Sequence, residues 1–320
     1  MALTGADAVV VGAGVIGLTT AVCLAEAGLR VTVVAADPPE RTTSMAAGAM
    51  VGPVFVARSE SGGAREHASF DEFVRLASVP GTGVRISTGR FAARVGGPDA
   101  PAIHRPTDVV PLGPAELPAP FTSGFRASVP CVDMPRYLNY LRRRLTDAGG
   151  AIEIRRLGSL AEATAWAPLV ANCPGVGARA LVPDPSVRPV RGQHVIVENP
   201  GLDTFFIEAP FGPSWISYFP HGGHVVLGGI AAQDNWSLEP DPEIADEILA
   251  RCMAAEPRLA GARVIGHRVG LRPARPEVRL EGQELDRTRI VHDYGHGGNG
   301  VALSWGCARE ASALLTGPPP

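Results

Sequence analysis

The first apolar runs of the chain predict a buried strand–helix–strand unit. Residues 9–11 form an apolar run short enough for a buried strand, a helical pattern follows to Ala27, and residues 31–34 form a second run. A glycine-rich turn, residues 12–17, joins the first strand to the helix. Gly28 stands where a left-handed residue usually ends a helix. This order predicts a parallel β-α-β unit.

Later patterns alternate between helix and strand and then become sheet-like. Helices are predicted at 69–77, 133–148, 242–255 and 301–315, and strands at 151–157, 169–173, 190–197, 204–207, 215–230 and 291–294. A hairpin turn is expected at Gly222-Gly223, inside the longest of these runs. Residues 270–276, which contain two prolines and two arginines, are expected to form a rigid turn.

These patterns predict two domains. One is an α/β nucleotide-binding domain of the Rossmann type, and the other is an α+β domain on a mostly antiparallel sheet. The first is assigned to residues 1–50, 131–186 and 268–320. The second, which we expect to bind substrate, is assigned to residues 51–130 and 187–267.

Composition narrows the possible functions. A chain of 320 residues with 45% hydrophobic residues and a net charge of −3 is typical of a globular protein that binds neither nucleic acid nor anionic membranes. No apolar run reaches the about 18 residues of a membrane span, and we expect no signal peptide and a cytoplasmic location. The five cysteines are never spaced CxxC, so we expect reduced thiols and no metal site.

All 29 basic residues are arginine. The absence of lysine excludes Schiff-base chemistry, which needs a lysine amine. Any positively charged side chain that binds an anion in an active site is therefore expected to be arginine, whose planar guanidinium pairs well with carboxylates.

The glycine-rich turn carries the chemistry of a dinucleotide site. Gly12 permits the tight turn, Gly14 lets the backbone approach a pyrophosphate, and Gly17 allows close packing of helix and sheet. The helix N-terminus at Val15 and Ile16 presents free N–H groups to the phosphates. Asp37 ends the second strand about 20 residues after Gly17, where a carboxylate can bind a ribose hydroxyl. The motif does not choose between NAD and FAD, although Asp37 disfavours NADP.

Two further segments contain candidates for cofactor contact. The first is the small, polar stretch that follows Asp37, with Thr42, Thr43, Gly48 and Ala49. The second is a strand–glycine loop–helix unit near the C-terminus, where a helix N-terminus can hold negative charge. Its candidate residues are His296, Gly297, Gly298, Gly300 and Val301.

Taken together, these motifs resemble the D-amino-acid oxidase family of FAD enzymes, which includes D-aspartate oxidase. The resemblance rests on VVGAGVIGLTTA (residues 10–21), GLRPARP (270–276) and HDYGHGGNG (292–300), and it spans most of the chain. It implies that the first domain binds FAD, noncovalently because no cysteine or histidine is compellingly placed for a flavin bond. It also implies a D-amino acid and O2 as partners, and it leaves a homodimer open.

The resemblance also implies roles for individual residues. Arg272 would pair with the substrate carboxylate beside the flavin, Tyr218 would assist it, and the carbonyl of Gly298 would receive the substrate amine. Ile207, Trp215 and Phe219 would surround the side chain, with Glu208 the nearest charge. A lid tyrosine typical of the family is missing from the short segment 209–214, where Trp215 is the nearby aromatic residue.

The resemblance implies oxidative deamination. Hydride passes from the substrate to FAD, the imino acid hydrolyses to a 2-oxo acid and ammonia, and O2 reoxidises the flavin to give hydrogen peroxide. We expect neutral, apolar D-amino acids to be preferred. The alternatives are an amine oxidase acting on glycine or N-methyl amino acids, a D-aspartate oxidase and, more distantly, a nicotinamide-dependent dehydrogenase.

Overall fold

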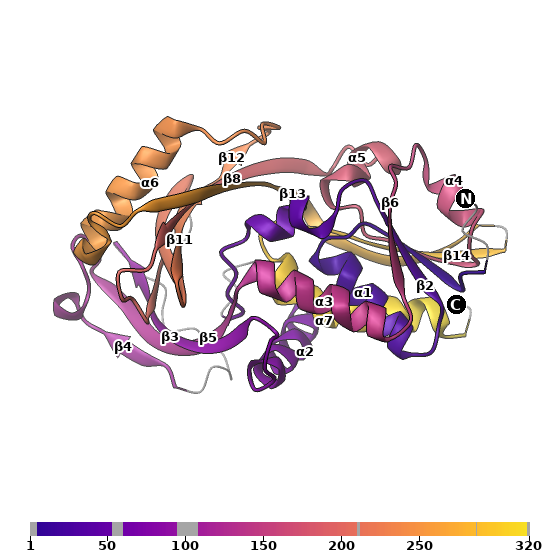
Figure 1. Cartoon of the computed structure of the whole chain (residues 1–320), viewed down its shortest axis with the longest axis horizontal. Coiled ribbons are helices and arrows are strands. Elements are labelled where there is room, and N and C mark those ends of the chain that lie inside the picture. The colour runs from indigo at the N-terminus through magenta and orange to yellow at the C-terminus, as the bar shows by residue number, and fades with distance from the viewer. Residues whose placement is uncertain (1–4, 53–59, 95–107, 210–211, 286, 319–320) are drawn as a thin grey trace.

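One continuous β-sheet runs through the protein (Figure 1). The computed structural model describes residues 5–52, 60–94, 108–209, 212–285 and 287–318. The strands lie in the order β4-β5-β3-β9-β10-β11-β8-β13-β14-β7-β1-β2-β6, and β12 pairs with β8. In the described chain no helix is both long and apolar enough to cross a bilayer.

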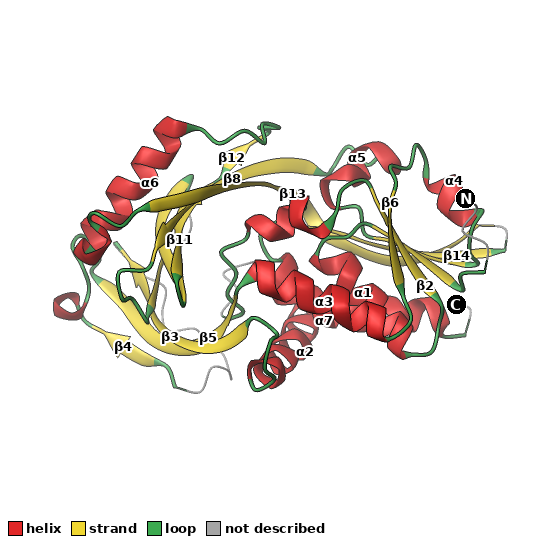
Figure 2. Ribbon diagram, viewed as in Figure 1, coloured by secondary structure: helices red, strands yellow, loops and turns green. Residues whose placement is uncertain are grey.

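The parallel end of the sheet contains the predicted β-α-β unit. Its strands are β1 (Ala8–Val11), β2 (Val31–Ala35), β6 (Ala151–Ile154), β7 (Leu169–Asn172) and β14 (Thr288–His296). One face is covered by the helices α1 (Val15–Glu26), α3 (Met134–Asp147) and α7 (Gly300–Thr316) (Figure 2). The opposite face packs against the short helix α4 (Leu160–Thr164), and α5 (Ala178–Leu181) follows β7. Burial on both faces explains why these strands are continuous apolar runs.

The other end of the sheet is mostly antiparallel. Its strands are β3 (Val84–Ala93), β4 (Val110–Leu112), β5 (Ser123–Val132), β8 (Arg188–Glu198), β9 (Phe205–Glu208), β10 (Ser214–His221), β11 (His224–Ile230) and β12 (Ala232–Gln233). The helix α6 (Pro242–Ala255) covers one face, with Ile248 and Cys252 packed on Leu227. The opposite face carries Phe219 and Ile207. The predicted combination of an α/β Rossmann-type part and an α+β part on a mostly antiparallel sheet is confirmed.

The expectation of a rigid turn at residues 270–276 is wrong. These residues lie inside β13 (Val264–Leu285), which pairs first with β8 and then with β14. Arg272 lies opposite Val190, and β13 pairs with β8 without a register shift from Gly266 to Ala274. Pairing with a strand on either side therefore overrides the local turn preference of proline. The consequence is that β13 connects the parallel and antiparallel parts of the sheet (Figure 1).

The helix predicted at 69–77 is longer than expected. It also packs against helices of the first domain, although its residues were assigned to the second. Helix α2 (Glu60–Ala77) packs on α7, and Phe73 and Leu76 share a hydrophobic core with α1 and α3. The Gly306 amide in α7 donates a hydrogen bond of 2.8 Å to the Ser69 hydroxyl. Residues 60–77 thus pack with the helical layer of the parallel end, although 51–130 was assigned to the second domain.

Candidate active site

A cavity of about 370 Å³ lies where the parallel strands end and β13 passes to the antiparallel part. This volume is within the usual range of ligand and cofactor sites. It brings together cofactor candidates from four separate segments of the chain. They are Gly12, Gly14, Val15, Ile16, Asp37, Thr42, Thr43, Arg272, His296, Gly297, Gly298, Gly300 and Val301.

The glycine-rich turn fits the phosphates of a dinucleotide. Gly12 has φ +104°, and a Cβ there would lie 2.3 Å from the Cys173 carbonyl oxygen. A Cβ on Gly17 would lie 1.9 Å from the Gly12 oxygen, so Gly17 does not line the cavity but holds α1 against the turn. The first turn of α1 carries no acidic residue, which leaves its positive end available to an anion.

Two polar features adjoin this turn. The Val15 amide donates a hydrogen bond of 2.8 Å to the Ser44 hydroxyl, which ties the short helix at Thr43–Ala46 to the start of α1. Asp37 is half exposed at the cavity wall, 3.7 Å from the guanidinium of Arg156. A carboxylate in this position can accept hydrogen bonds from ribose hydroxyls, as the sequence predicted.

The loop between β14 and α7 brings a second helix N-terminus to the cavity. Gly297 has φ +55°, and the capping residue of α7, Asn299, makes no side-chain cap. The free N–H groups of α7 can therefore stabilise negative charge on a bound group. The sequence expectation for this unit is consistent with the geometry.

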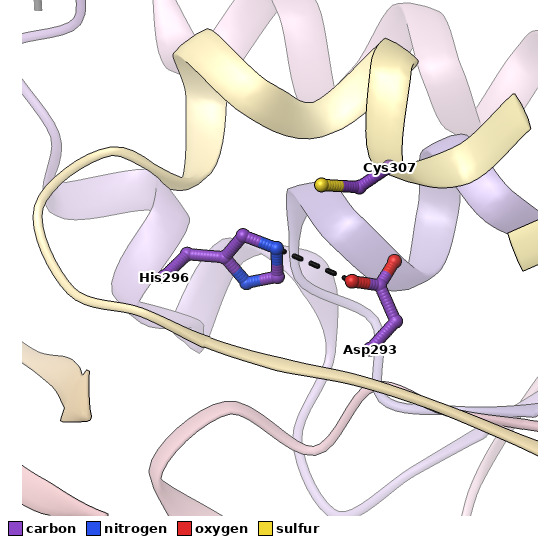
Figure 3. Close-up of side chains that lie close together, drawn as sticks. All are labelled: Asp293, His296 and Cys307. Carbon is purple, nitrogen blue, oxygen red and sulfur yellow. Dashed lines mark ion pairs between the residues drawn. The ribbon is translucent and has the colours of Figure 1, made fainter. Parts of the chain in front are cut away.

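His296 lies at the cavity wall beside a buried carboxylate. Its Nε2 atom lies 3.2 Å from Asp293 Oδ1, and the Cys307 thiol lies beside the pair (Figure 3). Asp293 is completely buried. Burial raises the pKa of the Cys307 thiol well above its usual value, so the sulfur stays protonated. We assign this cluster the role of orienting the imidazole that lines the cavity.

Arg272 is the cation of the cavity. Its Nη1 donates a hydrogen bond of 2.9 Å to the Ile230 carbonyl, and its guanidinium lies over Gly192, where a Cβ would be 2.6 Å away. The guanidinium carbon lies 5.5 Å from the ring centre of Trp215. Burial lowers the pKa of Arg272 to about 10. No carboxylate of the described residues forms an ion pair with it, which leaves donors free for an anionic ligand.

Tyr218 does not reach this cavity. Successive residues of a strand point to opposite faces, and the Tyr218 ring stacks on Phe206, 5.5 Å between ring centres, on the face covered by α6. Its hydroxyl accepts a hydrogen bond from Arg90 at 3.2 Å. The side chain of the preceding residue, Ser217, lies on the cavity face, since a Cβ on Gly228 would meet both Ser217 and His194. The predicted assisting role of Tyr218 is therefore misplaced by one residue.

None of the three residues expected around the substrate side chain, Ile207, Trp215 and Phe219, lines the cavity. Phe219 and Ile207 are buried on the cavity face of the sheet, and Trp215 contacts Arg272. Gly48 packs against the Phe219 ring, while the Ala49 carbonyl accepts a hydrogen bond from Val132. Neither Gly48 nor Ala49 lines the cavity. Of the predicted short lid segment, residues 210 and 211 lie outside the described residues.

Two charged side chains near the expected pocket, those of Glu208 and Arg275, form ion pairs with other residues of the protein. Glu208 forms an ion pair with Arg94 and accepts a hydrogen bond of 2.8 Å from the Ile216 amide, on the α6 face of the sheet. Arg275 lies 3.1 Å from Asp184. Neither side chain is placed to meet the side chain of a ligand.

The cavity residues that the sequence analysis did not assign to the site include Ser44, Gly192 and His194. Each acts through a contact with a residue distant in sequence, such as the hydrogen bond between His194 and the Ala46 carbonyl. The small, polar run at 42–44 was a weak signal for Ser44. Local sequence carried no such signal for Gly192 or His194.

The parallel sheet, the glycine turn and the two helix N-termini around one cavity are typical of a protein that binds a dinucleotide cofactor. The family model described as FAD dependent oxidoreductase matches residues 7–314. The chain belongs to this family, and its cofactor is FAD.

Relatives of known name support the assignment. The chain is 50% identical over 315 residues to the D-amino-acid oxidase of Rubrobacter xylanophilus, covering 97% of this chain and 95% of that protein. It is 34% identical over 334 residues to human D-aspartate oxidase, covering 96% and 94%. A solved structure, glycine oxidase from Geobacillus kaustophilus, is similar in fold, with a TM-score of 0.81 at 19% identity and coverage of 97% and 94%.

Proposed function

We propose that this protein oxidises D-amino acids to 2-oxo acids and ammonia, with hydrogen peroxide as the product of O2 reduction. The observation that carries the proposal is the buried Arg272, which has no ion-pair partner among the described residues and lies in the FAD cavity. Similarity to a D-amino-acid oxidase over nearly the whole chain supports the choice of substrate.

Arg272 orients the substrate. Its planar guanidinium forms a bidentate, charge-assisted pair with the α-carboxylate, which is stronger because the site is desolvated. The carbonyl of Gly298, in the loop before α7, receives the substrate amine. FAD, when bound, supplies the acceptor for the hydride of the substrate Cα. Holding both polar groups of the substrate sets the position of that hydrogen, and orientation of this kind supplies much of the rate.

The same two contacts impose stereospecificity. Once the carboxylate and the amine are fixed, the Cα–H bond of one enantiomer points toward the flavin and that of the other points away. The positive end of α7 would stabilise negative charge on bound FAD. The protein thus contributes orientation and electrostatics, and the flavin contributes the redox chemistry.

Peroxide release from FAD-loaded protein tests the proposal and its nearest alternative. We expect activity with D-alanine, at least about 100-fold lower kcat/KM with L-alanine, and weak activity with glycine and N-methylglycine. A higher kcat/KM for glycine or N-methylglycine than for D-alanine would instead identify the protein as an oxidase of glycine or N-methyl amino acids. Activity with neither D-alanine nor those substrates would remove the proposal.

FAD is expected to be bound without a covalent bond. The histidine nearest the cavity loop, His296, directs Nε2 to Asp293, and Cys173 and Cys307 are buried thiols of raised pKa. Acid precipitation should release all the yellow colour into the supernatant. Colour that remains in the pellet after repeated washing would contradict this expectation.

A further inference from the structure

His194, in β8, has a fixed tautomer. Its side chain is 8% exposed, and Nδ1 lies 2.7 Å from the carbonyl oxygen of Ala46. A carbonyl oxygen only accepts hydrogen bonds, so Nδ1 carries the proton. Nε2 is therefore left with a lone pair, and it is a hydrogen-bond acceptor.

This acceptor lies on the cavity face of the sheet. His194 lines the cavity, as do Gly192 and Arg272, and the guanidinium of Arg272 lies over Gly192 on the same face. Gly228 makes room for the ring, because a Cβ there would lie 2.4 Å from Cδ2 and 2.7 Å from Nε2. The hydrogen bond of the His194 ring to the described residues is made through Nδ1, and none is made through Nε2.

The surroundings of His194 keep the imidazole neutral. Burial, together with the positive charges of Arg272 and Arg268, lowers its pKa to about 4. No carboxylate of the described residues forms an ion pair with it. At neutral pH the cavity thus contains a cation and a neutral acceptor, which match a carboxylate and a neutral amine.

We propose that Nε2 of His194 accepts a hydrogen bond from the α-amine of the substrate whose carboxylate is bound by Arg272. The proposal rests on the proposed function and adds a substrate contact to it. A neutral imidazole that is a weak base does not take the proton of an ammonium group. That proton passes to water, and His194 then holds the neutral amine, whose lone pair assists loss of the Cα hydride.

Two aromatic acids separate the amine contact from the carboxylate contact. Benzoate carries only a carboxylate, and 2-aminobenzoate carries a neutral amine beside it. Their Kd values are measured from the change in flavin absorbance of the FAD-loaded protein, without turnover. For His194→Leu we expect about 10-fold weaker binding of 2-aminobenzoate and less than threefold change for benzoate. KM for D-alanine should rise by about 10-fold or more.

Two further variants complete the test. His194→Gln, whose amide oxygen can accept a hydrogen bond, should recover much of the affinity for 2-aminobenzoate. The matched control is His224→Leu, a histidine of the neighbouring strand β11 that does not line the cavity. It should leave both Kd values unchanged.

The outcomes distinguish the two proposals. Equal weakening of both acids in His194→Leu, or no weakening of either, would overturn the role of His194. Failure of benzoate to bind the unmodified protein would count against the carboxylate site at Arg272 and the function built on it. A selective loss of 2-aminobenzoate binding supports His194 even if D-alanine is a poor substrate.

Discussion

Arg272→Met is expected to lower kcat/KM for D-alanine by about 1000-fold while FAD stays bound. The guanidinium is buried, and within the described part of the chain it is hydrogen-bonded to the Ile230 carbonyl. Removing one partner of a desolvated charged pair costs about 2–5 kcal/mol, because the carboxylate would lose its water without gaining a cation. The visible spectrum of the flavin reports whether the cofactor is retained, and steady-state peroxide release gives the rate.

Arg268→Met is the matched control for this variant. Arg268 lies on the same strand and the same face of the sheet, but it does not line the cavity. We expect its kcat/KM to stay within about threefold of the unmodified protein. An Arg272→Met variant that turns over D-alanine at nearly the original rate would show that another group binds the carboxylate.

D-valine is expected to exceed D-aspartate in kcat/KM by about 100-fold. The residues that we propose for the side-chain position, Ile207 and Phe219, are apolar and buried. Arg275 is committed to Asp184, so a second carboxylate would be desolvated without a partner. Such burial costs a few kcal/mol, and 100-fold corresponds to about 2.7 kcal/mol.

D-arginine tests the opposite charge. A basic side chain would be tolerated only if a carboxylate such as Glu208 faced the pocket, and Glu208 is instead paired with Arg94 on the other face of the sheet. We therefore expect D-arginine to be disfavoured as well. A clear lead for D-aspartate would show that an arginine enters the pocket.

The glycine-rich turn was predictable because its constraints are local. Gly12 needs a positive φ, and Gly17 packs on the Gly12 carbonyl a few residues away. Contacts between residues this close in the sequence can be predicted from their spacing. The helix signals at Asp133 and at Asp241-Pro242 are local for the same reason, and α3 and α6 begin there.

The face of a strand was less predictable. In β10 nearly every residue is buried, because one face packs against α6 and the other against the cavity side. The sequence shows no alternation of polar and apolar residues, so it does not indicate whether the odd- or the even-numbered residues of the strand face the cavity. Tyr218 was therefore assigned to the site, although Ser217 faces it. A residue role transferred from a family is most easily assigned to the wrong residue in a strand that is buried on both faces.

Long-range contacts account for the remaining differences. The strand conformation of residues 270–276 depends on pairing with β8, which lies far earlier in the chain. His194 acquires its tautomer from the Ala46 carbonyl, also distant in sequence. Helix α2 takes its place from packing on α7. None of these partners could be identified from the local sequence.

The most direct test of D-amino acid oxidation by FAD is anaerobic mixing of the yellow protein with substrate. We expect D-alanine to bleach the flavin absorbance completely, and admission of O2 to restore it with one peroxide per flavin. L-alanine and reduced nicotinamide should leave the colour unchanged on the same time scale. Bleaching by L-alanine or by reduced nicotinamide, with none by any neutral D-amino acid, would contradict the account.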